Sequence, residues 1–121
     1  MALRALRGAT QVEVDDREAI IDATAELVRA VLDRNGLTDE DLVSILFTTT
    51  PDLVAEFPAY AARTIGITDV PFLCASEIAV PGALERVVRL MAFVEADFSR
   101  AQARHVYLRG AQALRTDLPR D

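Results

Sequence analysis

Residues 2–11, ALRALRGATQ, open the stretch that decides the fold, and residues 12–36, VEVDDREAIIDATAELVRAVLDRNG, complete it. From Ala2 to Arg7, apolar and charged side chains recur in a pattern that is typical of a strand, with Leu6 and Arg7 on opposite faces. Gly8 follows, and a glycine at this place predicts that the strand ends or bulges there. We therefore expect a first strand that carries an arginine on the face opposite to a buried leucine.

The second part of the stretch predicts a helix. Asp15 and Asp16 precede it and can cap its first turn, and Gly36 follows as a residue that can end it. The apolar side chains between these signals recur at the spacing of one helix face: Ile20, Ala23, Leu27 and Val31.

Turn residues divide the rest of the chain into shorter elements. Thr38 with Asp41 resembles a capping box before a short helical turn. Residues 84–94 fit either a helix face or a buried strand, and we favour a strand from Val87 onward. The other patterns predict strands at 43–49, 70–75 and 105–114, a helix at 58–66, and a mobile C-terminal tail over 115–121 that includes the LPRD of 118–121.

Composition excludes several classes of function. The formal net charge of −6 leaves no general basic face, so nucleic acid and acidic membrane surfaces are not expected partners. The N-terminal residues MALRALRGATQ carry charge without a continuous apolar run, and no apolar run in the chain approaches membrane-spanning length. We expect a single domain over residues 1–121 that works in the cytoplasm.

All 13 basic residues are arginine. This bias has two interpretations, a compositional preference or a need for planar donor groups that match carboxylates, and composition does not decide between them. One cysteine, Cys74, excludes an internal disulfide, and one histidine, His105, leaves too few ligands for a zinc site. We therefore expect no metal.

The usual catalytic motifs are missing, since the chain has neither a glycine-rich phosphate loop nor a G-x-S-x-G sequence. His105 lies in an apparent strand and is interpreted as structural. Cys74, in the apolar sequence VPFLC, is interpreted as a small buried hydrophobic residue rather than a nucleophile. The remaining charged and polar side chains in the predicted strands, or just past one in the case of Glu77, together suggest an anion site: Arg7, Arg89, Glu77 and Tyr107.

Five segments resemble the monofunctional, AroH-class chorismate mutases in order and spacing along nearly the whole chain. They are RGATQVEVD (7–15), TPDLVAEFPAYAAR (50–63), VPFLCASEIAVPG (70–82), RHVYL (104–108) and LRTDL (114–118). The resemblance implies an α+β fold in which a mixed β-sheet packs with helices, assembled as a homotrimeric pseudo-α/β barrel with an active site at each interface.

The family reaction is the Claisen rearrangement of chorismate to prephenate in phenylalanine and tyrosine biosynthesis. It is a unimolecular step that needs no nucleophile and no cofactor. Negative charge builds on the ether oxygen as the C–O bond breaks, so the requirements are cations for two carboxylates, a donor at that oxygen, and walls that hold the substrate compact.

By resemblance, Arg89 donates to the ether oxygen, Arg7 and Tyr107 bind a carboxylate, and Glu77 accepts the ring hydroxyl. Cys74 lies near that hydroxyl and counts with Arg89, Glu77 and Arg7 as catalytic. Tyr60 stands where some relatives have lysine, which predicts one cation fewer at the rim. The resemblance adds these substrate contacts: Phe57 and Ala59 on the ring, Leu73, Ala75 and Ser76 in the wall, Arg63 and Arg115 at the entrance, and Leu114.

Two other functions stay open on the sequence. A trimeric enamine/imine deaminase-like enzyme would also bind a carboxylate with arginine, but it must activate water, and Glu77 is the only obvious base. A non-catalytic protein could bind an aromatic-pathway metabolite through the same arginines. Turnover of imino acids would identify the first alternative, and binding of chorismate without conversion would identify the second.

Overall fold

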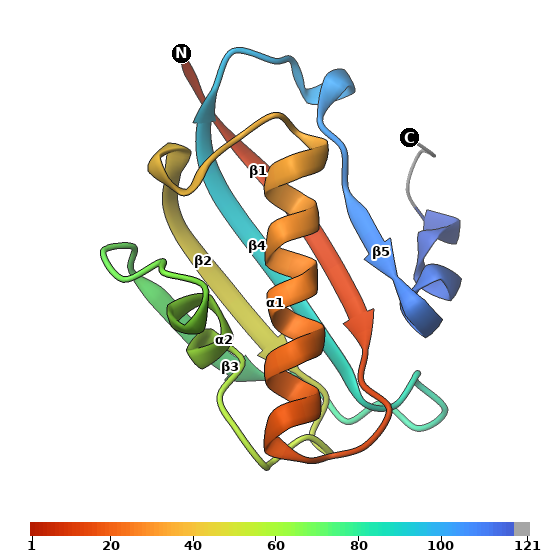
Figure 1. Cartoon of the computed structure of the whole chain (residues 1–121). Coiled ribbons are helices and arrows are strands. Elements are labelled where there is room, and N and C mark those ends of the chain that lie inside the picture. The colour runs from red at the N-terminus through yellow and green to blue at the C-terminus, as the bar shows by residue number, and fades with distance from the viewer. Residues whose placement is uncertain (118–121) are drawn as a thin grey trace.

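The computed structural model describes residues 1–117, in which one five-stranded sheet has two α-helices on one face (Figure 1). The mixed sheet confirms the α+β class expected from the sequence. The strands are β1 (Ala2–Gln11), β2 (Leu42–Thr49), β3 (Phe72–Ser76), β4 (Val87–Ala96) and β5 (Val106–Leu108). The helices are α1 (Arg17–Arg34) and α2 (Ala59–Thr64), with three 3-10 helices, η1 (Asp39–Asp41), η2 (Arg100–Gln102) and η3 (Arg109–Asp117).

The sheet has the strand order β3-β2-β4-β1-β5. Strand β4 runs antiparallel to its neighbours β1 and β2, whereas β3 pairs with β2 and β5 with β1 in parallel. Because directly paired residues point to the same face, the register sets one row of side chains across all five strands. That row is Ala75, Thr48, Arg89, Ala9 and Tyr107.

Helix α1 packs closely on the middle of the sheet. Leu6 is fully buried in this core, while Arg7 is half-buried on the opposite face, as the alternation predicted. Gly8 neither ends nor bulges β1, because it pairs regularly with Leu90 and Val106. A Cβ at Gly8 would lie 3.1 Å from side-chain atoms of both Leu27 and Val31. Glycine therefore allows β1 to approach α1.

The two ends of α1 follow the predicted signals. The Asp16 carboxylate accepts hydrogen bonds from the main-chain N–H groups of Glu18 (2.8 Å) and Ala19 (3.3 Å) at the first turn. Gly36 adopts a positive φ of 65° after the last turn, and the next N–H, of Leu37, donates to Leu32 O at 2.9 Å. Local sequence thus sets the length of α1 and the direction in which the chain leaves it.

Most other elements confirm the predictions within a few residues, including β4 from Val87 and the capping box at Thr38, whose N–H donates to Asp41. The strand predicted for 105–114 is wrong on both sides of β5. His105 lies just before that strand, and the residues after Leu108 form η3.

The chain turns out of the sheet at Arg109, which has a φ of 52°. A Cβ at Gly110 would overlap the end of the Gln11 side chain, which would have to move. Beyond it, Ala111 is buried against Ala9 and Tyr107. Of the tail predicted at 115–121, Arg115 to Asp117 belong to η3, while 118–121 lie outside the described residues, so its mobility stays a prediction.

The sheet face opposite α1 and α2 carries apolar side chains that are open to solvent in the single chain. Leu46, Met91 and Phe93 are half-buried, while Leu3 and Leu73 are 60% and 67% exposed. Exposed apolar surface of this kind on a folded domain marks a contact with another molecule.

Candidate active site

A hollow of about 170 Å³ lies on this open face of the sheet. Its floor comes from β1, β2 and β4, and three of the residues predicted for the anion site line it, namely Arg7, Arg89 and Tyr107. Thr48 lines it as well. The sequence positions of these residues are far apart, and the sheet register brings them together.

Glu77 joins this group through side-chain contacts. Its carboxylate accepts from Arg89 Nε, with distances of 3.2 Å to Oε1 and 3.1 Å to Oε2. Oε2 also accepts from the Thr48 hydroxyl at 2.6 Å. The side chains of Arg89 and Glu77 are 34% and 17% exposed, so the ion pair is sheltered but reaches solvent. The Glu77 carboxylate therefore binds the Arg89 guanidinium at its Nε edge.

Backbone contacts hold the strands that bear these groups. The Glu77 N–H donates to Thr49 O at 2.8 Å, which extends the pairing of β3 with β2. The Arg7 N–H donates to Nδ1 of His105 at 3.0 Å, which ties β1 to the segment before β5. This contact agrees with the structural interpretation of His105. Tyr107 is 4% exposed and packs against Ala9 and Ala111.

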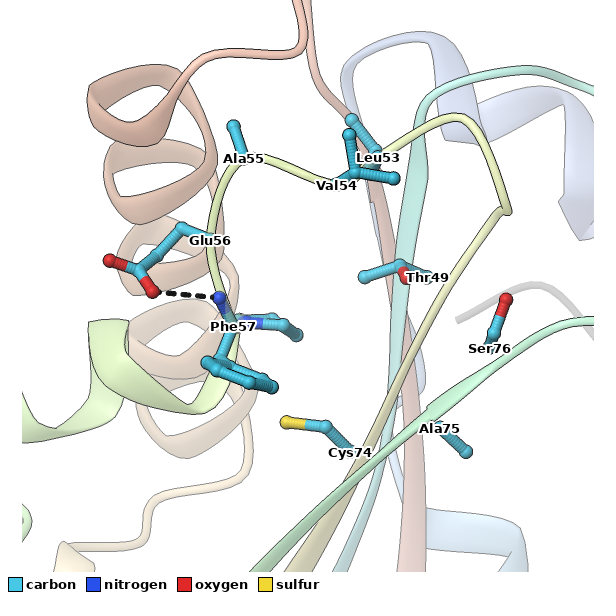
Figure 2. Close-up of a pocket in the computed structure, with 10 residues that line it drawn as sticks. Thr49, Leu53, Val54, Ala55, Glu56, Phe57, Cys74, Ala75 and Ser76 are labelled. Carbon is cyan, nitrogen blue, oxygen red and sulfur yellow. Dashed lines mark hydrogen bonds between the residues drawn. The ribbon is translucent and has the colours of Figure 1, made fainter.

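A second and larger hollow, of about 440 Å³, lies between β3 and the segment from Leu53 to Pro58 (Figure 2). Phe57 and Cys74 point toward each other inside it, while Ala75 points to the other side of β3. This hollow shares no lining residue with the first one. Phe57 is 71% exposed, so most of its ring has no partner surface in the single chain.

Charged residues hold the segment that carries Phe57. Asp15 Oδ1 accepts from two consecutive main-chain N–H groups, of Val54 and Ala55, each at 3.0 Å. The Glu56 carboxylate accepts from the Phe57 N–H at 2.9 Å, drawn in Figure 2, and from Arg17 Nε at 2.8 Å.

The hydrogen bond to Glu56 is the main cause of a raised pKa for Arg17, against a smaller lowering by desolvation. The Arg17 guanidinium also lies 5.0 Å from the centre of the Tyr60 ring. Arg17 thus stays charged and places a cation beside the position where the sequence predicted one to be missing, although Glu56 and Glu18 pair with it.

The structure therefore separates the predicted site residues into two groups. Arg7, Glu77, Arg89 and Tyr107 gather at the first hollow, which we call the arginine hollow. Phe57, Cys74, Ala75 and Ser76 line the second, which we call the phenylalanine cleft. The other predicted residues lie at neither: Leu73 is exposed on β3, Ala59 and Arg63 are on α2, and Leu114 and Arg115 are on η3.

Sequence reasoning missed Thr48. The strand predicted at 43–49 included it, but nothing in its own neighbourhood distinguishes it from Thr49 or Thr50. Only the register of β2 with β4, which sets Thr48 opposite Arg89, identifies it as a member of the site.

Residues 1–117 contain no group of three or more His, Cys, Asp or Glu side chains that could hold a metal ion. Among the helices of the same residues, none is both long and apolar enough to span a membrane.

The chain matches the family described as chorismate mutase type I over residues 3–118. It is 49% identical over 117 residues to the chorismate mutase AroH of Thermus thermophilus, with 96% of each chain covered. It is 42% identical over 119 residues to that of Bacillus subtilis, with 98% of this chain and 94% of the relative covered. The solved chorismate mutase from Clostridium thermocellum superposes with a TM-score of 0.89 at 43% identity, covering 91% of this chain and 98% of that one.

Proposed function

The chain belongs to the type I chorismate mutase family and rearranges chorismate to prephenate, and we propose that it does so in an arginine-lined site that two subunits complete. The family resemblance found in the sequence is thereby confirmed, and the deaminase-like alternative has no support in these comparisons. We place the reaction in the cytoplasm, as the sequence predicts.

The observation that carries this proposal is the arrangement of Arg89 against Glu77 beside Arg7. The rearrangement breaks the ether C–O bond and forms a C–C bond within one molecule, so the protein supplies only position and charge. Arg89 donates from its terminal nitrogens to the ether oxygen, whose negative charge grows as the bond lengthens. Since the contact strengthens toward the transition state, it lowers the barrier rather than only binding the substrate.

The other residues of the arginine hollow hold the substrate in the reactive shape. Arg7 and Tyr107 bind a carboxylate at the end of the hollow that β1 and β5 form. Glu77 keeps a carboxylate oxygen for the ring hydroxyl and stabilises the positive charge that the ring develops. Each side chain is preorganised by strand pairing, so little free energy is spent on ordering them when the substrate binds.

The protein works as a homotrimer in which the phenylalanine cleft of one subunit closes the arginine hollow of the next. Three observations support this arrangement. The two hollows share no residue, Phe57 is 71% exposed, and the open sheet face carries Leu3 and Leu73 exposed to solvent. A second copy that covers this face would bury the apolar surface and set Phe57 against the substrate ring. The contacts predicted for Ala59 and Arg63 of α2 would come from the same second copy.

The experiment is a turnover assay with purified protein and chorismate, without added cofactor or metal. We expect chorismate to disappear and prephenate to form in equal amounts. Binding of chorismate without conversion would reject the proposal in favour of a metabolite-binding protein. Turnover of imino acids with none of chorismate would favour the deaminase-like enzyme instead.

A further inference from the structure

The hydroxyl of Thr48 is a part of the site that the catalytic assignments above do not use. It lies in β2, directly opposite Arg89 in β4 and Ala75 in β3. Its Oγ1 donates to Glu77 Oε2 at 2.6 Å, the shortest of the three contacts that the Glu77 carboxylate makes with side chains in the described chain. A hydroxyl donor to a carboxylate at this separation is a strong, charge-assisted hydrogen bond.

The same carboxylate pairs with Arg89 in an unusual way. A guanidinium and a free carboxylate commonly pair through two parallel N–H···O bonds, which can use the terminal nitrogens. Here the carboxylate instead sits beside Nε, which donates to both of its oxygens. Oε2, which accepts from Thr48 of β2, is also one of the two oxygens that accept from Nε at the side of the guanidinium. The terminal nitrogens, with four of the five N–H donors, are then left to face a ligand.

The geometry points to Thr48 as a positioning residue for the rearrangement: its hydroxyl keeps Glu77 on the Nε side of Arg89, so that the terminal N–H groups stay available to the ether oxygen. This inference rests on the proposed function. Thr48 touches neither reacting bond and acts through Glu77. Without the hydroxyl, the carboxylate can rotate toward the terminal nitrogens and compete with the substrate for the same donors.

The test compares two substitutions at Thr48. Thr48→Val keeps the shape and β-branching of the side chain but removes the hydroxyl, while Thr48→Ser keeps the hydroxyl. We expect Thr48→Val to lower kcat by about tenfold with KM changed by less than about threefold, since hydrogen bonds to charged groups are among the stronger ones. Thr48→Ser should retain kcat within about twofold, because it keeps the donor. Equal losses in both variants, or full activity of Thr48→Val, would overturn the inference.

A double-mutant cycle separates positioning from a general effect on the fold. In a Glu77→Ala background the acceptor that Thr48 holds is gone, so adding Thr48→Val should change kcat by less than about twofold. A further tenfold loss in that background would show that Thr48 acts by another route. If wild type turns over chorismate and Arg89→Ala does not, while Thr48→Val is fully active, this inference fails and the proposed function stands. If wild type shows no turnover, the proposed function fails first.

Discussion

Replacing Arg89 by alanine removes the donor on which the proposed rate enhancement depends. The Arg89 side chain is 34% exposed, so water that enters after the substitution has limited access and does not supply the lost positive charge. Removing one preorganised oxyanion donor typically costs about 2.7 to 4 kcal/mol, or about 10² to 10³ in kcat. We therefore expect kcat of Arg89→Ala to fall by at least about a hundredfold.

The structure predicts a second effect of the same substitution. Without Arg89, the Glu77 carboxylate keeps only the Thr48 hydroxyl as a side-chain partner in the described residues, and its charge then repels a dianionic substrate. KM should therefore rise in Arg89→Ala, and a double variant with Glu77→Gln should recover KM but not kcat. Arg89→Lys keeps the charge without the planar donor group, and it should recover only part of kcat.

The assay is steady-state consumption of chorismate by each variant, with far-ultraviolet circular dichroism to verify the fold. A kcat for Arg89→Ala within tenfold of wild type would remove Arg89 from its assigned role. If the variant with both Arg89→Ala and Glu77→Gln has the same KM as Arg89→Ala alone, the unpaired Glu77 charge does not repel the substrate. The ion pair then has another purpose.

Substitutions at three further positions test how the fold holds the site. Gly8→Ala should destabilise the protein by about 1–3 kcal/mol in urea unfolding, because the methyl group crowds α1; an unchanged midpoint contradicts that packing. Asp16→Ala should lower the free energy of unfolding by about 1 kcal/mol, whereas Asp16→Ser should retain most of the wild-type stability, since serine also caps a helix. Asp15→Ala should raise KM for chorismate, since it releases the segment that carries Phe57. A KM equal to that of wild type would show that this segment does not take part in substrate binding.

The parts of the fold that follow local rules could be predicted from the sequence. The alternation around Leu6 and Arg7 identifies β1 and assigns its two faces, and Asp16 with Gly36 sets the ends of α1. These signals act over a few residues, so no knowledge of the partner strands is needed. Residue type and position in or beside the strands suggested Arg7, Glu77, Arg89 and Tyr107 as an anion site, the family resemblance added their roles, and the structure brings these four together.

Features that depend on distant residues could not be predicted. Residues after Leu108 leave the sheet at Arg109, which has a φ of 52°, and Ala111 is buried with Ala9 from about a hundred positions earlier, which their own β-compatible sequence does not reveal. Thr48 belongs to the site only because β2 pairs with β4 in one register. The resemblance implies a site at each subunit interface, and in the single chain Phe57 and Arg89 line separate hollows.

The proposed formation of each site from two subunits of a homotrimer is tested most directly by mixing two inactive variants. Arg7→Ala damages the arginine hollow and Phe57→Ala damages the phenylalanine cleft, so each homotrimer should have low activity on chorismate. When the two are unfolded together and refolded into mixed trimers, some interfaces combine an intact hollow with an intact cleft, and activity should rise well above that of either variant alone. Mixed trimers, verified by mass, that stay as inactive as the separate variants would contradict a shared site and place all of its residues within one chain.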